Sequence, residues 1–378
     1  SHGNTTIHEL RVAVLAPRWR REGVASGSMI QDALRALIDG RDLDEPQTMD
    51  AMDAVLSGAA SPAQIAALAT ALRVKGETAT EICAAARCLR RRCEWVDGLA
   101  GVVLDTCGTG GGPAQTFNVS TVAAIVVAAC GVPVAKHGLR AVTSRTGSAD
   151  VVEALGVRID APRAAVTRCL REVGIAFLYA PAFHVALAHA GVVRQELGFR
   201  TIFDLLGPLA NPAGATHQLM GVHSPRYLRS MAEVLGRLGV RRAWVLHGSG
   251  GMDEVSPFGD TQVVSVRQGV LVESTVSPSD FGLDLVADTG SLAGGDPRTN
   301  AAIAHAVIDG EPGPRRTAVV LNAAAALVVA EVTADLKEAA TMAAKAIDSG
   351  AARTTLQRWI EVSNEEIDDG ANDATHEA

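Results

Sequence analysis

Short apolar runs alternate with helical patterns from about residue 100 onward, and this alternation limits the fold more than any other feature of the chain. Buried strands that alternate with helices are typical of βαβ units, because the crossover helices cover both faces of a parallel sheet. The sequence therefore predicts an α/β domain with a mostly parallel central sheet. The runs predict strands at 102–104, 132–135, 157–159, 176–179 and 243–246, and helices at 119–130, 149–155 and 318–331.

Two segments depart from this alternation. Before residue 97, apolar residues recur at spacings of three and four, and Pro62 falls at the first turn of a helix, which predicts a small all-helical unit. Between residues 261 and 277, two β runs meet at Gln268-Gly269, which is typical of a hairpin and adds antiparallel strands. We interpret the basic run at 90–92 as a solvated last helical turn, favoured by the helix dipole.

These patterns divide the chain into three parts. We expect a helical domain over residues 27–98, with part of 184–198 packing on it. An α/β domain is expected over 99–362, followed by an acidic frayed tail over 363–378.

Composition and charge exclude several classes of function. The formal net charge of −8 argues against a general nucleic-acid binder, which needs a basic surface. The apolar stretch at 119–135 is broken by Gly131 and Pro133 and is too short for a membrane span. The six cysteines form no C-x-x-C pair, so no zinc site is predicted. The sequence starts Ser-His-Gly without an apolar signal core, so we expect a cytoplasmic protein that binds neither nucleic acid nor membrane.

A glycine-rich loop at 108–112 follows a predicted strand and precedes a predicted helix. Such a loop lets backbone N–H groups approach an anion, and the helix dipole then favours a phosphate. The loop matches neither the dinucleotide fingerprint nor a phosphate-binding P-loop, which ends in Gly-Lys-Ser or Gly-Lys-Thr. A tight turn explains the loop equally well.

Three further clusters carry charge. Residues 136–148 concentrate Lys136, two arginines and hydroxyl side chains, which suits a phosphate or diphosphate, although a solvated loop is the alternative. Asp253 and Glu254 follow a predicted strand and a glycine loop, where hard carboxylate oxygens bind Mg²⁺ well, although adjacent acids are common on surfaces. Arg194 lies near the end of a helix, where a plain surface charge is the simplest interpretation.

Together these motifs resemble the anthranilate phosphoribosyltransferases over roughly residues 30 to 360. The matching segments, in order, are 108–111, 116–121, 136–140, 147–150, 205–209 and 253–254. The resemblance implies transfer of the 5-phosphoribosyl group from phosphoribosyl diphosphate (PRPP) to the amine of anthranilate in tryptophan biosynthesis. It also implies a type III phosphoribosyltransferase fold of the nucleoside phosphorylase-like class, with a small helical domain hinged to a large α/β domain, usually as a homodimer.

The resemblance implies roles for individual residues of this sequence. Lys136 is the expected catalytic residue, because it would neutralise the leaving diphosphate. Ser120, Asp253 and Glu254 would hold Mg²⁺, and Arg194 would bind the carboxylate of the acceptor. The acceptor site would further include Gly108, His137 and Leu139, and PRPP would be held by Gly108, Gly111, Gly112, Thr116, Asn118, Ser120, Thr121, Lys136, Ser144 and Ser148.

The chain departs from the family pattern at three positions. Gly112 stands where Asp is usual, and both Leu139 and Asp204 stand where Asn is usual. Leu139 is the most informative, because it can neither donate nor accept a hydrogen bond beside the acceptor. This departure predicts a specialised relative, in secondary metabolism, with a changed or relaxed aromatic acceptor.

Two alternatives remain open from the sequence. A nucleoside phosphorylase shares the implied fold and uses phosphate in place of diphosphate. A non-enzymatic, nucleic-acid-binding relative of the same fold should be basic, which this chain is not.

Overall fold

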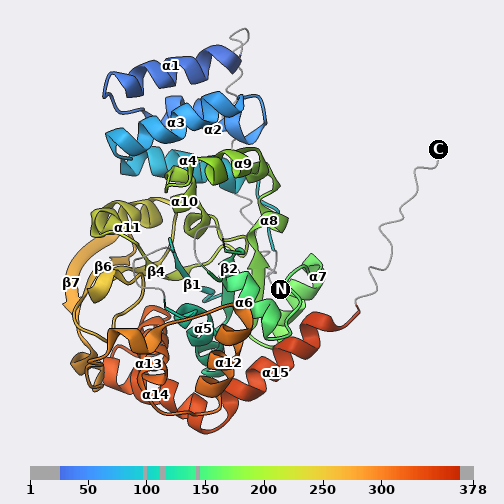
Figure 1. The fold of residues 1–378 in the computed structure, drawn as a ribbon, viewed down its shortest axis with the longest axis vertical. Coiled ribbons are helices and arrows are strands. Elements are labelled where there is room, and N and C mark those ends of the chain that lie inside the picture. Colours follow the sequence, from blue (N-terminus) through green and yellow to red (C-terminus); the bar gives the residue numbers. More distant parts are fainter. Residues whose placement is uncertain (1–25, 97–99, 111–115, 142–144, 367–378) are drawn as a thin grey trace, which may run out of the picture.

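The computed structural model describes residues 26–96, 100–110, 116–141 and 145–366. A helical layer lies at one end of the molecule, and an α/β domain makes up the rest (Figure 1). The helical layer consists of α1 (Ser26–Ile38), α2 (Glu45–Leu56), α3 (Pro62–Lys75) and α4 (Ala79–Arg91), with α9 (Ala188–Leu197) packed against α2 and α3. The small helical domain predicted from the apolar spacing is confirmed.

Local sequence explains where these helices begin. Each of α2, α3 and α4 is preceded by a capping residue whose side chain accepts a hydrogen bond from the backbone N–H of the third residue of the helix. The side chain of that third residue in turn accepts a hydrogen bond from the backbone N–H of the capping residue. This reciprocal arrangement satisfies backbone donors that the first turn leaves free. The three pairs are Asp44 with Gln47, Ser61 with Gln64, and Thr78 with Glu81.

The described strands form one seven-stranded sheet in the order β3-β2-β1-β4-β5-β6-β7. Their bounds are β1 Leu104–Gly108, β2 Val134–Gly138, β3 Ile175–Tyr179, β4 His217–Gly221, β5 Arg242–Gly248, β6 Thr261–Arg267 and β7 Val270–Val276. The first five strands are parallel, and β6 and β7 are antiparallel. The hairpin between β6 and β7 turns at Gln268 and Gly269, whose φ angles of 49° and 82° are both positive, as a tight two-residue turn requires. The mostly parallel sheet and its hairpin are thus confirmed.

Two details of the sheet differ from the expectation. The predicted strand at 157–159 is wrong, because the backbone N–H of Val157 bonds to Val152 and that of Arg158 bonds to the Ser363 hydroxyl, so neither joins the sheet. Conversely, β4 lies in the middle of the sheet although no strand was predicted there. Its run His-Gln-Leu-Met-Gly begins with polar residues, and the burial of Gln218 is made possible by its amide donating to the Pro208 carbonyl.

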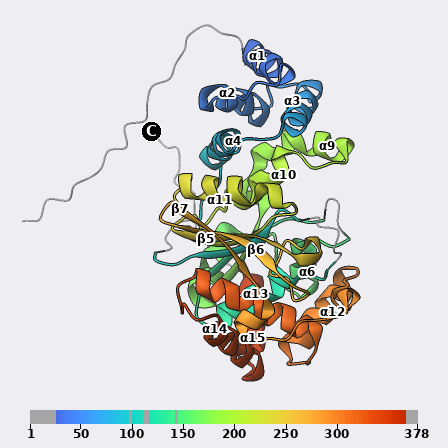
Figure 2. The same cartoon turned by 90° about the vertical axis from the view of Figure 1, so that its left-hand side faces the viewer.

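Helices cover both faces of the sheet (Figures 1 and 2). On the face away from the helical domain lie α5 (Val119–Ala129), α12 (Pro297–Ile308), α13 (Pro314–Val329), α14 (Leu336–Asp348) and α15 (Ala351–Asn364). On the other face, α10 (Ile202–Leu206) and α11 (Leu228–Arg237) lie between the sheet and the helical domain. The remaining helices are α6 (Ser148–Ala154), α7 (Arg163–Glu172) and α8 (Ala180–Phe183).

The hydrophobic core of the helical domain is continuous with that of the α/β domain. Its buried residues, among them Leu68 and Leu89, form one cluster with residues of α10 and α11 and with the adjoining face of the sheet. A second cluster joins the opposite face of the sheet to α5, α13 and α14. At the C-terminal end, α15 runs to Asn364 with Ser363 buried, so helix extends two residues past the boundary expected at 362. No helix in the described part of the chain is long and apolar enough to cross a membrane.

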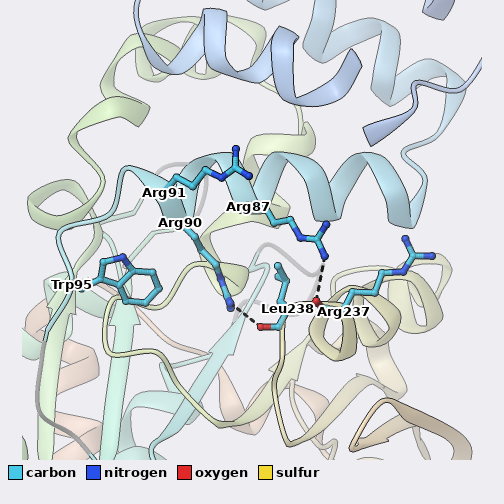
Figure 3. A pocket seen from close by; sticks show the side chains of 6 residues that line it. All are labelled: Arg87, Arg90, Arg91, Trp95, Arg237 and Leu238. Atoms are coloured by element: carbon cyan, nitrogen blue, oxygen red, sulfur yellow. Dashed lines mark hydrogen bonds between the residues drawn. The ribbon is translucent and has the colours of Figure 1, made fainter. Parts of the chain in front are cut away.

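Arg90 joins the helical domain to the α/β domain, and the expectation of a solvated turn at 90–92 is wrong for this residue. Its Nε donates to the Leu209 carbonyl at 2.6 Å, and its Nη1 donates to the Leu238 carbonyl at 3.1 Å. Leu238 is the C-cap of α11, where unpaired carbonyls favour a cation. Figure 3 shows Arg90 reaching from α4 toward Leu238, with Trp95 to one side. All three residues line a pocket of about 340 Å³.

We expect Arg90→Met to lower the free energy of unfolding by about 2–3 kcal/mol, because it leaves two carbonyls without a charged donor. Arg91→Met is the matched control, since Arg91 is the next residue of the same helix and is exposed. It should change the stability by less than about 0.5 kcal/mol. Chemical denaturation of both variants checks this, and equal losses would contradict the role of Arg90.

Candidate active site

Four adjacent parallel strands end in glycine at the same edge of the sheet. These residues are Gly138 of β2, Gly108 of β1, Gly221 of β4 and Gly248 of β5. A Cβ atom at Gly221 would lie 1.6 Å from the backbone oxygen of Asp253, and one at Gly108 would lie 2.4 Å from the carboxylate of Asp253. Glycine therefore lets the loop that follows β5 cross directly over the ends of β1 and β4.

This edge contains the point where the strand order reverses. The chain leaves β1 through α5 toward β2 on one side, and leaves β4 through α11 toward β5 on the other. In open α/β sheets, ligands bind in the crevice outside the carboxyl ends of the strands at such a point. The glycine-rich loop predicted from the sequence starts here, at the end of β1.

The described part of that loop is held from three directions. The backbone N–H of Gly110, whose φ is 65°, donates to Asp253 Oδ2 at 2.8 Å. The hydroxyl of Thr109 lies 2.8 Å from Nδ1 of His223 and accepts from the His223 backbone N–H at 2.9 Å. Arg200 donates to the Thr109 carbonyl at 2.5 Å. Sequence analysis missed Arg200, because an isolated arginine after a helix has no motif around it.

Lys136 is buried in the middle of β2. Its Nζ donates to the Thr106 carbonyl at 2.6 Å and to the Ser120 hydroxyl at 3.3 Å. Burial lowers the pKa of Lys136, and the negative charges of Asp105 and Glu254 oppose this shift. The structure therefore brings together Lys136 from β2 and Ser120 from the first turn of α5.

Asp253 and Glu254 share a small cavity with Ser120. The cavity measures about 10 Å³, which is close to the room that one water molecule or one ion needs. The Oε2 atom of Glu254 is buried and has no hydrogen-bond partner in the part of the chain that the structure describes. Burial first, and then the charge of Asp253, raise the pKa of Glu254 well above its usual range, while Lys136 opposes the shift. A cation in the cavity would offset both effects.

The oxygen atoms of Ser120, Asp253 and Glu254 fit an Mg²⁺ ion that also binds a substrate. They fit less well a metal ion bound only by protein side chains. Among the described residues, no group of three or more His, Cys, Asp or Glu side chains could hold a metal ion. Mg²⁺ is usually bound by one or two carboxylates together with phosphate oxygens of a substrate, and it keeps several waters. Ser120, Asp253 and Glu254 therefore fit a magnesium ion that is shared with a phosphorylated ligand.

Asp105 and Asn211 are buried beside Lys136 and His137 and bond to each other. The sequence analysis assigned no role to either residue. The Asn211 amide donates to Asp105 Oδ2 at 2.8 Å and to the Ala135 carbonyl at 2.7 Å. The backbone N–H of His137 donates to the other oxygen of Asp105 at 3.3 Å. Burial raises the pKa of Asp105 to about 6, although the charge of Lys136 opposes this. The signal in the sequence was the acidic residue Asp105 directly after the apolar run of a predicted strand.

The other residues predicted to bind PRPP lie around the start of α5 and α6. Asn118 occupies the N-cap position of α5, and its side chain accepts a hydrogen bond from the Asn300 amide at 2.9 Å. The buried hydroxyl of Thr121 has no hydrogen-bond partner among the described residues. Thr116 pairs with Ala293 in an isolated β-bridge. Ser148 begins α6, close to Gly138. Gly111, Gly112 and Ser144 lie outside the described residues.

His137 is a buried, neutral imidazole at the end of β2. Its Nδ1 lies 3.1 Å from the Gly207 carbonyl, and its ring meets that of His184 edge-on, with 5.1 Å between the ring centres. Burial first, and then His184, lower the pKa of His137 to about 3, and burial lowers that of His184 to about 4. Leu139 follows the strand, is partly buried, and accepts from the Ala149 N–H through its carbonyl.

Arg194 lies on α9, where its guanidinium is already paired. Its Nη2 donates to Oδ1 of Asp204 at 2.9 Å, and the two side chains are 18% and 21% exposed. The simple surface charge inferred from the residues alone is therefore wrong for Arg194. Any ligand that Arg194 binds must share the guanidinium with Asp204.

The buried histidines predict a loss of stability at acidic pH. Because the pKa of His184 is about 4 in the folded chain and about 6.5 in an unfolded one, its stabilising contribution is present above pH 6.5 and is lost as the pH falls toward 4. His184→Gln should therefore reduce the pH slope of the unfolding free energy by up to about 1.4 kcal/mol per pH unit. His305→Gln, at an exposed position, is the control and should leave the slope unchanged. Denaturant titrations between pH 4.5 and 7 measure both slopes, and equal slopes would contradict the assignment.

Comparison with known proteins agrees with this geometry. Residues 31–93 match the family model described as "Glycosyl transferase family, helical bundle domain", and residues 100–353 match "Glycosyl transferase family, a/b domain". The chain is 51% identical to the anthranilate phosphoribosyltransferase of Myxococcus xanthus over 333 residues, which cover 88% of this chain and 98% of the relative. It is 50% identical to that of Moorella thermoacetica over 336 residues, which cover 88% and 99%.

Solved structures give the same result. The anthranilate phosphoribosyltransferase of Thermus thermophilus superposes with a TM-score of 0.83 at 42% identity, covering 88% of this chain and all of that one. The Saccharomyces cerevisiae enzyme in complex with PRPP and Mg superposes with a TM-score of 0.81 at 28% identity, covering 89% and 98%. The chain therefore belongs to the anthranilate phosphoribosyltransferase family.

Proposed function

We propose that this chain transfers the 5-phosphoribosyl group from PRPP to the amine of anthranilate or a related aromatic acid and releases diphosphate. The observation that carries the proposal is one small cavity near the strand-order reversal that Ser120, Asp253 and Glu254 line, with Lys136 donating to the Ser120 hydroxyl beside it. Relatives support it, because the yeast enzyme has been solved with PRPP and Mg and also with 4-fluoroanthranilate.

The proposed mechanism is mainly positioning and charge stabilisation. The amine of an aniline-type acceptor is neutral at pH 7 and already nucleophilic. The difficulty is the departure of diphosphate and the positive charge that builds on the ribose ring. Lys136, held in place by Thr106 and Ser120, offsets the growing charge of the leaving group. Attack from the face opposite to diphosphate inverts the anomeric carbon.

The start of α5 supplies the anion site. Gly108 and Gly110 have no side chains to fill the loop, and the first turn of α5 presents the hydroxyls of Ser120 and Thr121 at the positive end of the helix dipole. Mg²⁺ held by Ser120, Asp253 and Glu254 would supply further charge neutralisation on the diphosphate. We place Gly111, Gly112, Thr116, Asn118, Ser144 and Ser148 around the same ligand, and Gly108, His137, Leu139 and Arg194 around the acceptor.

The carboxylate pair is the most direct test. Asp253→Asn combined with Glu254→Gln should lower kcat/KM for diphosphate release from PRPP and anthranilate by more than about a hundredfold, the loss typical for removal of a preorganised charge. The free energy of unfolding should not fall, because burial raises the pKa of both carboxyls and the neutral side chains avoid that penalty.

Asp260→Asn is the matched control, since Asp260 is an exposed acid close in sequence to the pair. It should retain the activity of the native chain. Native activity in the double variant, with a native unfolding curve, would contradict the proposed metal role of Asp253 and Glu254.

The alternatives are separated by their products. A nucleoside phosphorylase would cleave a nucleoside in the presence of phosphate and would not release diphosphate from PRPP. A nucleic-acid-binding relative would shift DNA in a gel at low salt, and the shift would weaken as salt rises. The proposed function predicts diphosphate release alone.

The homodimer, the cytoplasmic location and a place in secondary metabolism remain predictions from the sequence. Sedimentation of the chain at micromolar concentration would measure whether it forms a homodimer. The changed acceptor predicted from Leu139 also remains open, and a panel of substituted benzoates assayed on the native chain and on Leu139→Asn addresses it.

A further inference from the structure

The ion pair between Arg194 and Asp204 is built into the start of α10. One oxygen of Asp204 accepts from Arg194 Nη2 at 2.9 Å, and the other accepts from the Thr201 backbone N–H at 2.8 Å. Thr201 is the N-cap of α10 and Asp204 is its third residue, so the two form a capping box. The carboxylate is therefore fixed by the helix on one side and by the guanidinium on the other.

The pair is joined to the glycine-rich loop through the start of α10. Arg200, which directly precedes Thr201, donates to the carbonyl of Thr109 at 2.5 Å. Thr109 directly precedes Gly110, which is held by Asp253. Arg194 and Asp204 thus belong to the surroundings of the proposed active site and not to a distant surface.

Pairing changes which ligands Arg194 can bind well. An aromatic carboxylate would compete with Asp204 for the same guanidinium and would meet a like charge beside it. The guanidinium has five N–H donors, of which Asp204 occupies one, and its Nε is buried with no partner among the residues that the structure describes. A carboxamide fits this arrangement without repulsion, because its carbonyl can accept from Arg194 while its amide can donate to Asp204.

We propose that Asp204 is a specificity-determining residue, which by pairing with Arg194 allows the acceptor site to take aromatic amines bearing a neutral carboxamide as well as those bearing a carboxylate. This inference rests on the proposed phosphoribosyl transfer and on the placement of Arg194 at the acceptor. It concerns a position where this chain has Asp and the family pattern has Asn.

The experiment compares two acceptors, anthranilate and 2-aminobenzamide, by diphosphate release from PRPP. The native chain should use both, with kcat/KM values within about tenfold of each other, because one additional charge-assisted hydrogen bond corresponds to about that factor. Asp204→Asn should raise kcat/KM for anthranilate about tenfold and should not raise it for 2-aminobenzamide. The KM for PRPP should stay unchanged, since Asp204 is not assigned to that substrate.

Glu273→Gln is the control for the change in net charge. Glu273 forms an exposed ion pair with Arg229 at 2.8 Å on β7, away from the parallel strand ends. This variant should leave the ratio of the two acceptors unchanged. A thermal unfolding curve of Asp204→Asn tests whether this variant still folds with α10 capped. The ratio of kcat/KM for the two acceptors, measured on the native chain, tests the proposal without any variant.

Two results would overturn the inference: no reaction of the native chain with 2-aminobenzamide while anthranilate reacts, or an acceptor ratio that Asp204→Asn leaves unchanged. Failure of the proposed function looks different, because then neither acceptor releases diphosphate from PRPP in the native chain.

Discussion

The burial of one ammonium group, that of Lys136, is the constraint on which the rest of the site depends. A cation without water needs acceptors and a compensating charge. The Thr106 carbonyl and the Ser120 hydroxyl supply the acceptors, and Asp105 supplies the charge. Asp105 in turn is held by Asn211. These partners come from β1, α5 and the segment before β4, so the contacts of Lys136 join β2 to all three.

The glycines at the strand ends complete that arrangement by allowing close approach. Because Gly108 and Gly221 lack side chains, the Asp253 backbone and carboxylate lie directly on the ends of β1 and β4. The negative charges of Asp253 and Glu254 thereby come close enough to Lys136 to oppose the loss of its proton. The site thus combines a fixed cation with carboxylates at raised pKa, which is the pattern expected where a metal and a phosphorylated substrate complete the charge balance.

Much of this architecture could be predicted from the sequence, because it depends on local pattern. The parallel sheet follows from apolar runs between helices, and the β6–β7 hairpin follows from Gln268-Gly269. The central strand β4 could not be predicted, since its polar residues are buried only through tertiary hydrogen bonds such as that from Gln218 to Pro208. Two side-chain pairs also could not be predicted, because they depend on how separate elements pack in the folded chain. Asp105 bonds to Asn211, 106 residues away, and Arg194 of α9 bonds to Asp204 of α10. Gly111, Gly112 and Ser144 lie outside the described residues and stay predictions.

The hydrophobic cluster shared by the helical domain and the sheet has a consequence for motion between them. Separating the two parts would expose one continuous hydrocarbon layer, including Leu89 and the side of α11 that packs on α4, to water. Arg90 holds the two parts together at one edge of that layer. A movement that opened the layer would expose apolar area and change the heat capacity of binding, whereas a movement that kept it buried would leave the burial of the ligands as the main contribution.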